Sequence, residues 1–112
     1  MDELHATIMG RRIKLDCDFT AGDVTVPAGF ISDFASIPRL FWRVLPPWGE
    51  YNRAAVVHDY LYRTHLRTRA GADDLFLALM VELGVSRWKR RVMYRAVRMF
   101  GARAYRNGSA EG

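Results

Sequence analysis

The sequence predicts an α+β fold, in which a small N-terminal antiparallel β-sheet is followed by a tethered loop and three α-helices. Two observations predict it. Apolar and polar residues alternate between Ile13 and Phe19, whereas apolar residues recur at helical spacing from about residue 50 onwards. A length of 112 residues with 50% apolar residues is enough for a real core. We therefore expect a single domain over residues 1–112, without internal repeats.

The N-terminal part is expected to form the sheet. Residues 5–20 are extended, and their alternating segment has the period of a strand with one buried face. Ala21-Gly22-Asp23 then makes a tight turn and Val24-Thr25-Val26 returns, which gives two or three strands. Cys17 falls inside the predicted strand with no basic neighbour arranged beside it, so we expect it in the core rather than as a nucleophile.

The connection over residues 29–38 is unusually apolar, which implies that it is tied down on the core. Asp33 lies within it, either as a turn or cap residue or as a ligand or orienting group close to His58. Ser36 followed by Pro38 predicts the start of a short helix that runs through Arg43. Pro46-Pro47 would end that helix.

Three longer helices are expected over residues 50–63, 72–83 and 87–105. Gly84 is placed to end the second helix, and Ser86 to cap the third. The second is apolar over most of its surface and should be well buried. The third has an apolar stripe that we expect to face the core, made of Trp88, Val92, Ala96, Met99 and Phe100. The tail at about 107–112 has linker composition and is expected to be mobile.

Positive charge is concentrated in the last predicted helix. The chain has a net charge of +5 and a sequence pI of about 9.9. No acid occurs between Ser86 and Arg106, a segment with eight basic residues, of which six are our candidates for anion binding: Arg87, Lys89, Arg90, Arg91, Arg95 and Arg98. Such a helix can meet a nucleic-acid backbone, anionic lipid or an acidic protein, or it is a solvated face. No nucleic-acid-binding motif is present, so contact with nucleic acid would be nonspecific.

Composition also bounds the compartment. A single cysteine cannot form an internal disulfide, which fits either a reducing compartment or a fold that needs no covalent cross-link. The N-terminus is acidic and lacks the apolar region of a secretory signal. No apolar run approaches the roughly 20 residues of a transmembrane helix, so we expect no transmembrane segment.

The candidate site is centred on His58 in the first long helix. Tyr62 lies four residues on, so the two share a helix face, and Asp59 is adjacent. A His–Asp pair is a general-base unit for activating water, and either Asp73 or Asp74 of the next helix can approach the imidazole. Asp59 could hold an oxygen-coordinated metal beside it. The alternative is a core histidine satisfied by a neighbouring hydrogen bond. Zinc spacings, phosphate-binding loops and serine-nucleophile motifs do not occur.

Four segments carry a resemblance to a known family. They are Val26 to Pro38, Trp48-Gly49, Ala54 to Tyr62 and Ala72 to Phe76. With this order and spacing the chain resembles the DUF1353 family, small proteins found largely in tailed bacteriophages and prophages, from about Val24 to Gly101. The resemblance implies a phage origin, production in the host cytoplasm, other phage proteins as partners, and incorporation in the virion as one outcome.

A second, local resemblance is to phospholipase A2 enzymes, in particular the parvovirus capsid type. His58-Asp59-x-x-Tyr62 is similar to their catalytic helix, and Asp73-x-x-Phe76 to their supporting segment. The resemblance implies that His58 is the general base, that Asp59 is a calcium ligand, and that Asp73 orients His58 and accepts a hydrogen bond from Tyr62. Asp33 is our own candidate for a second metal ligand, since its loop could replace the calcium loop of these enzymes. The glycine-rich calcium loop of these enzymes has no counterpart here, since only Trp48-Gly49 lies in that region.

Two functions from different classes therefore stand. The first is a virion component or assembly factor, of the tail or neck, in which the His-Asp-Asp cluster is a buried polar site. The second is a calcium-assisted, phospholipase A2-like hydrolase of the bacterial envelope. The residues alone imply no certain cofactor. If the protein is the hydrolase, the cofactor would be Ca²⁺.

Overall fold

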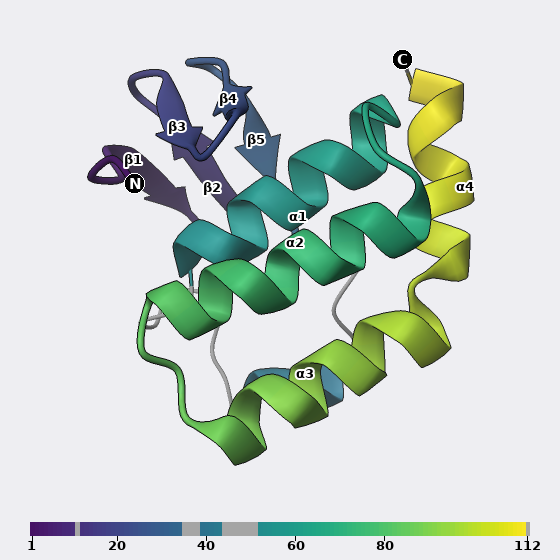
Figure 1. Cartoon of the computed structure of the whole chain (residues 1–112). Helices are drawn as coiled ribbons and strands as arrows, with labels where there is room; N and C mark the ends of the chain where they lie inside the picture. The colour runs from purple at the N-terminus through teal and green to yellow at the C-terminus, as the bar shows by residue number, and fades with distance from the viewer. Residues whose placement is uncertain (11, 35–38, 44–51, 112) are drawn as a thin grey trace.

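The computed structural model describes residues 1–10, 12–34, 39–43 and 52–111 and confirms the α+β class (Figure 1). Five short strands come first: β1 (Ala6–Met9), β2 (Arg12–Leu15), β3 (Phe19–Ala21), β4 (Val24–Val26) and β5 (Ile31–Ser32). A 3₁₀ helix, η1 (Arg39–Arg43), follows. The helices are α1 (Asn52–Thr64), α2 (Arg69–Glu82), α3 (Arg87–Phe100) and α4 (Ala102–Glu111).

The strands form two sheets rather than one. β1, β2 and β5 make an antiparallel sheet in that order, and β3 pairs with β4 in a separate hairpin. The hairpin turns at Gly22, whose φ of 61° favours glycine, as the turn prediction requires. The third strand of the first sheet, β5, lies inside the segment that we had expected to be a connection.

The alternating segment is not one strand, because the chain bends at residues 16–18 between β2 and β3. Asp18 Oδ1 accepts a hydrogen bond from the backbone N–H of Ala28 at 2.7 Å, which helps to hold the chain in this bend. Leu15 and Phe19 are buried on either side of it. Cys17 is exposed, so the expectation that it belongs to the core was wrong.

The apolar loop after β4 is tied down on the core, as predicted. Phe34 is buried at 1% exposure and adopts a φ of 57°, which is uncommon for a residue other than glycine. Its ring meets that of Trp42 from η1 edge-on, at a centroid distance of 6.3 Å. The helix start expected at Ser36 and Pro38, the Pro46-Pro47 stop and the Trp48-Gly49 segment lie outside the described residues.

Helix α1 is the centre of the molecule. It packs against α2 and α4 on one side and contacts β4 and β5 on the other (Figure 1). Four consecutive apolar residues, from Ala54 to Val57, are all buried, because elements cover the helix on more than one side. Helix α3 packs on α2 and lies at the edge of the molecule, with η1 behind it in Figure 1.

Helix α2 begins three residues before the predicted start. Thr68 is its N-cap, and its hydroxyl accepts a hydrogen bond from the Gly71 N–H at 3.1 Å. The C-terminal end matches the prediction, since Gly84 follows with a φ of 79°. Ser86 is the N-cap residue of α3, although its side chain makes no capping hydrogen bond.

The third predicted helix is two helices, which break at Gly101. The second of them, α4, continues to Glu111, so the expected mobile tail is helical in this structure. The predicted apolar stripe of α3 was wrong in three positions, because Trp88, Met99 and Phe100 are exposed, whereas Ala96 is buried. Besides Ala96, α3 buries Met93 and Val97, which the predicted stripe did not include.

Candidate functional site

The structure brings His58, Tyr62 and Asp73 together between α1 and α2. His58 Nε2 lies 2.6 Å from Asp73 Oδ1, and the Tyr62 hydroxyl donates to the same oxygen at 2.5 Å. The side chains of His58 and Asp73 are both 0% exposed. Both contacts that the sequence led us to expect are therefore present, in a place with no solvent-exposed surface. The catalytic role of these residues stays a prediction.

The second oxygen of Asp73 is also occupied. Arg98, from α3, donates to Asp73 Oδ2 at 2.9 Å, and this hydrogen bond raises the pKa of Arg98. Burial alone would raise the pKa of Asp73, but the hydrogen bonds from His58 and Tyr62 outweigh it and hold that pKa below its ordinary value. Asp73 is therefore a carboxylate whose three partners join α1, α2 and α3.

Aromatic rings enclose the imidazole. The His58 ring lies 4.1 Å from the ring of Tyr62 and 4.7 Å from that of Phe76, measured between centroids. Burial, with the hydrogen bond to Asp73, raises the pKa of Tyr62 well above its ordinary value, so its hydroxyl remains a donor. We call His58, Tyr62, Asp73 and Arg98 the Asp73 network.

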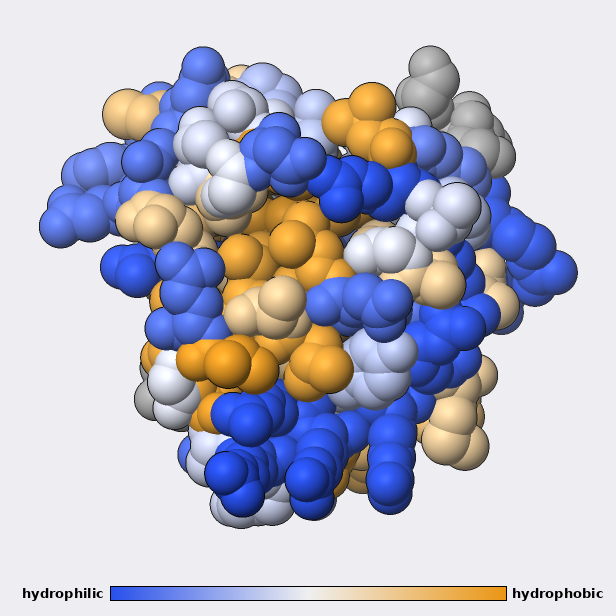
Figure 2. Space-filling view, in the orientation of Figure 1, coloured by the Kyte–Doolittle hydropathy of each residue, from blue (hydrophilic) through white to orange (hydrophobic). Residues whose placement is uncertain are grey.

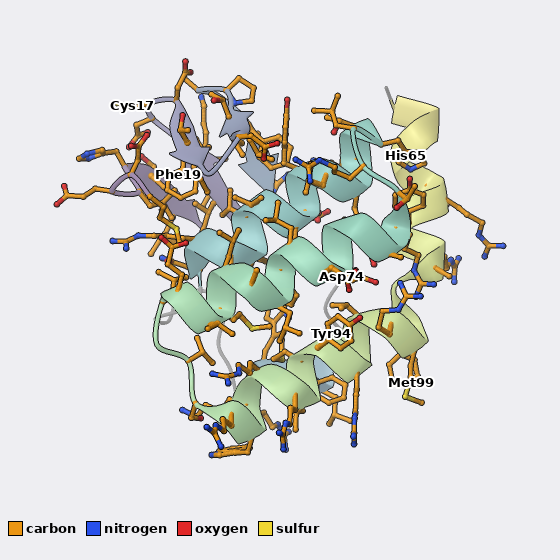
Figure 3. The ribbon with its side chains drawn as sticks, in the orientation of Figure 1. Cys17, Phe19, His65, Asp74, Tyr94 and Met99 are labelled. Atoms are coloured by element: carbon orange, nitrogen blue, oxygen red, sulfur yellow. The ribbon has the colours of Figure 1, made fainter. Side chains whose placement is uncertain are left out.

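Asp74, the alternative partner of His58, lies outside this network. It is exposed on α2 and accepts a hydrogen bond from the Tyr94 hydroxyl of α3 at 2.8 Å; Figure 3 labels both residues between the two helices. One helical position turns a side chain by about 100°, which is enough to separate the two aspartates. Sequence spacing left Asp73 and Asp74 open as partners of His58, and in the structure the partner is Asp73.

Asp59 faces a different element from its neighbour His58. The hydroxyl of Ser32, on β5, donates to Asp59 Oδ2 at 2.7 Å, and both residues are buried. Burial raises the pKa of Asp59, against the lowering effects of that hydrogen bond and of the charge on Arg63. This pair therefore attaches α1 to the sheet.

A cation of the protein already joins the two expected metal ligands. The guanidinium of Arg63 lies 3.0 Å from Asp33 Oδ1 and 3.9 Å from Asp59 Oδ1, and it donates to the Ile31 carbonyl at 2.8 Å. The part of the chain that the structure describes contains no group of three or more His, Cys, Asp or Glu side chains placed to hold a metal. Calcium prefers six to eight oxygen ligands, so this donor set does not fit it.

The six anion-binding candidates fall into two groups. Arg87, Arg91 and Arg95 are exposed. Of the others, which are partly buried, Arg90 donates to the Val85 carbonyl at 3.2 Å and Arg98 belongs to the Asp73 network. Lys89 is the third of these, and its Nζ lies 5.8 Å from the ring centroid of Trp88. Only part of the predicted cluster is thus presented to solvent.

Arg69 is a structural residue that sequence reasoning missed. It lies in the first turn of α2, where a positive charge is unfavourable to the helix dipole. Its guanidinium donates to the backbone carbonyls of Val97 and Arg98 near the end of α3. The sequence did carry a signal for this contact. A basic residue in the first turn of a helix needs a compensating partner elsewhere in the fold, and here the partners are the carbonyl groups near the end of α3.

Among the described residues, no helix has the length and apolar content to cross a membrane. This agrees with the expectation drawn from the hydropathy of the sequence.

Comparison with known proteins identifies the family. A family profile described as "Protein of unknown function (DUF1353)" matches residues 12–97. Two relatives come from Sinorhizobium fredii (strain NBRC 101917 / NGR234). Uncharacterized protein y4jT is 38% identical over 95 residues, which cover 79% of this chain and 28% of the relative. Uncharacterized protein y4iH is 36% identical over 74 residues, which cover 64% of this chain and 31% of the relative.

The chain thus spans less than a third of the length of either curated relative. No solved structure matches it. The profile match runs from β2 to Val97 of α3, so it includes His58, Tyr62 and Asp73, whereas Arg98 lies one residue beyond it. On these matches, the chain belongs to the DUF1353 family.

Proposed function

We propose that this protein is a structural component or assembly factor of a phage or prophage particle, and that the Asp73 network serves its fold rather than catalysis. The single observation that carries the second part is the complete burial of His58 and Asp73. A general base must reach a proton of water or substrate, whereas a buried network with satisfied partners can fix one arrangement of helices.

The phage assignment follows the family resemblance of the sequence. The protein would be made in the host cytoplasm during phage production, with other phage proteins as partners. The exposed arginines of α3 would meet an anionic surface, either a lipid headgroup layer or a nucleic-acid backbone.

Mass spectrometry of purified particles tests the assembly role. Particles induced from the bacterium that encodes the chain should contain it in constant proportion to a major structural protein, or should form incompletely when its gene is deleted. Particles that lack the protein and assemble normally without its gene would contradict the proposal.

A hydrolase is the second candidate function, and one observation favours it. Asp73 contacts His58 and Tyr62 in the manner that the phospholipase resemblance implies. Hydrolysis of phosphatidylglycerol vesicles, with and without Ca²⁺, tests it. The structural role predicts no hydrolysis above the buffer rate. Hydrolysis by the wild type that is lost in His58→Gln, provided that the variant still folds, would establish the enzyme instead.

A further inference from the structure

Helix α3 presents apolar as well as basic side chains to solvent. Trp88 is 58% exposed and Met99 is 71% exposed, and they lie on the same side of the helix as Arg91 and Arg95. Met99 extends away from α2 in Figure 3, whereas Tyr94 lies on the side of α3 that faces Asp74. Since the core side of α3 is supplied by Met93 and its neighbours, the outward apolar residues are not needed for packing within the chain.

The 3₁₀ helix lies beyond this face, at the end of α3 that carries Phe100. The ring of Phe41 lies 6.5 Å from that of Phe100, which places η1 beside the C-terminal end of α3. Leu40 of η1 is 73% exposed and Phe100 is 56% exposed. Phe100 lies on the opposite side of α3 from Arg91, so the outer face of α3 consists of Trp88, Arg91, Arg95 and Met99. In Figure 2, strongly hydrophilic residues mark the outer edge of α3 that carries its arginines.

We propose that the outer face of α3 binds anionic phospholipid bilayers peripherally. The proposal rests on the anionic-surface binding suggested above and selects one source of the anion. Arginines without intervening acids attract a negative surface, and each basic residue near such a membrane strengthens binding. Trp88 is of the type that favours the membrane–water interface, and Met99 on the same face would leave water in the headgroup region.

The apolar residues distinguish a bilayer from nucleic acid. Phosphate contacts on a nucleic-acid backbone would engage Arg91 and Arg95 but would leave Trp88 and Met99 in water. A bilayer uses both kinds of side chain at once. Binding should therefore depend on anionic lipid and should also depend on the apolar residues.

Vesicle flotation with the full chain tests the proposal. Wild-type protein should float with vesicles of phosphatidylcholine and phosphatidylglycerol and should stay at the bottom with phosphatidylcholine alone. Raising the salt from about 0.1 M to about 0.5 M should weaken the binding, because screening shortens the range of the charges. No binding to the anionic vesicles, or equal binding to both kinds, would overturn it.

Paired variants separate charge from apolar contact. The double variants Arg91→Glu/Arg95→Glu and Trp88→Ser/Met99→Ser should each reduce partitioning about tenfold or more. Matched controls change exposed residues elsewhere on the chain. They are Arg12→Glu/Lys14→Glu on β2, and Ile8→Ser/Leu66→Ser, which should bind as the wild type does. Circular dichroism melting verifies that each variant folds. Equal loss in controls and test variants would contradict the assignment of the surface.

A titration with DNA separates two ways in which the proposal can fail: binding to an anionic partner other than lipid, and no binding to anions. Wild-type protein is titrated into a short duplex at the same salt. Duplex binding stronger than vesicle binding, unaffected by Trp88→Ser/Met99→Ser, would overturn the lipid proposal and assign α3 to a nucleic-acid backbone. Binding to neither would remove both.

Discussion

Asp73 receives three hydrogen-bond donors from two other helices while its own side chain is fully buried. Removing one partner of a buried charged network is costly, because the remaining polar groups stay buried without compensation. Asp74, the next residue, makes one exposed hydrogen bond to Tyr94. The two aspartates therefore form a natural matched pair.

We expect Asp73→Asn to lower the free energy of unfolding by about 3 kcal/mol. Asp74→Asn should lower it by less than about 1 kcal/mol, because its partner can turn to water. Urea denaturation of both variants and the wild type measures the difference. Equal losses would show that Asp73 has no special part in holding the helices.

The lowered pKa of Asp73 also predicts a pH dependence. A folded-state pKa below the unfolded value, which is about 3.9, gives stability that is full above that value and is lost as the pH falls through the folded pKa. The stability gap between wild type and Asp73→Asn should therefore be constant above about pH 5 and shrink in acid. Asp59, whose pKa is raised, has the opposite slope, but it is common to both proteins and cancels. A gap that widens in acid would refute the assignment.

At the scale of the elements, the glycine at the break between α3 and α4 is explained by the space around residue 101. Gly101 is buried with an ordinary φ of −79°, so backbone freedom is not its reason. A Cβ there would lie 2.6 Å from the Tyr62 hydroxyl and would also overlap the Val97 carbonyl. The glycine leaves room for the Tyr62 hydroxyl, the group that donates to Asp73.

Gly101→Ala should therefore destabilise the protein by about 1–3 kcal/mol, through overpacking against Tyr62 and the backbone. Ala102→Ser, one residue on and exposed, should change the free energy of unfolding by less than about 0.5 kcal/mol and serves as the control. Thermal unfolding of the two variants provides the comparison. An alanine tolerated at residue 101 would mean that the close approach is not required.

Elements with strong local signals were predictable from the sequence. The helices α1 and α2, the Gly22 turn and the Gly84 end all follow from periodicity and turn chemistry. The site partners His58, Tyr62 and Asp73 followed from spacing together with the local resemblance. The sequence did not indicate which side of α3 packs against α2. Large apolar side chains occur on both sides of this helix, Trp88 and Met99 on the exposed side and Met93 and Val97 on the buried side. Ser32 and Arg98 reach the site from distant parts of the chain, so no local spacing indicated them.

At the scale of the whole molecule, α1 is held by polar contacts on two sides. His58 joins it to α2 through Asp73, and the next residue, Asp59, joins it to β5 through Ser32. Adjacent positions on a helix point in directions about 100° apart, so the two contacts together fix the rotation of α1 between the sheet and the helices. A buried His-Asp dipeptide thus has a structural reason that needs no catalysis.

The measurement that tests this account most directly is modification of histidines by diethyl pyrocarbonate, followed residue by residue with mass spectrometry. The chain has three histidines in three environments: His5 is exposed, His65 is partly buried against Tyr105, and His58 is fully buried. The account predicts rapid modification of His5 in the native protein and modification of His58 only on unfolding. Modification of native His58 at a rate near that of His5 would mean that solvent reaches it, and would contradict a purely structural role.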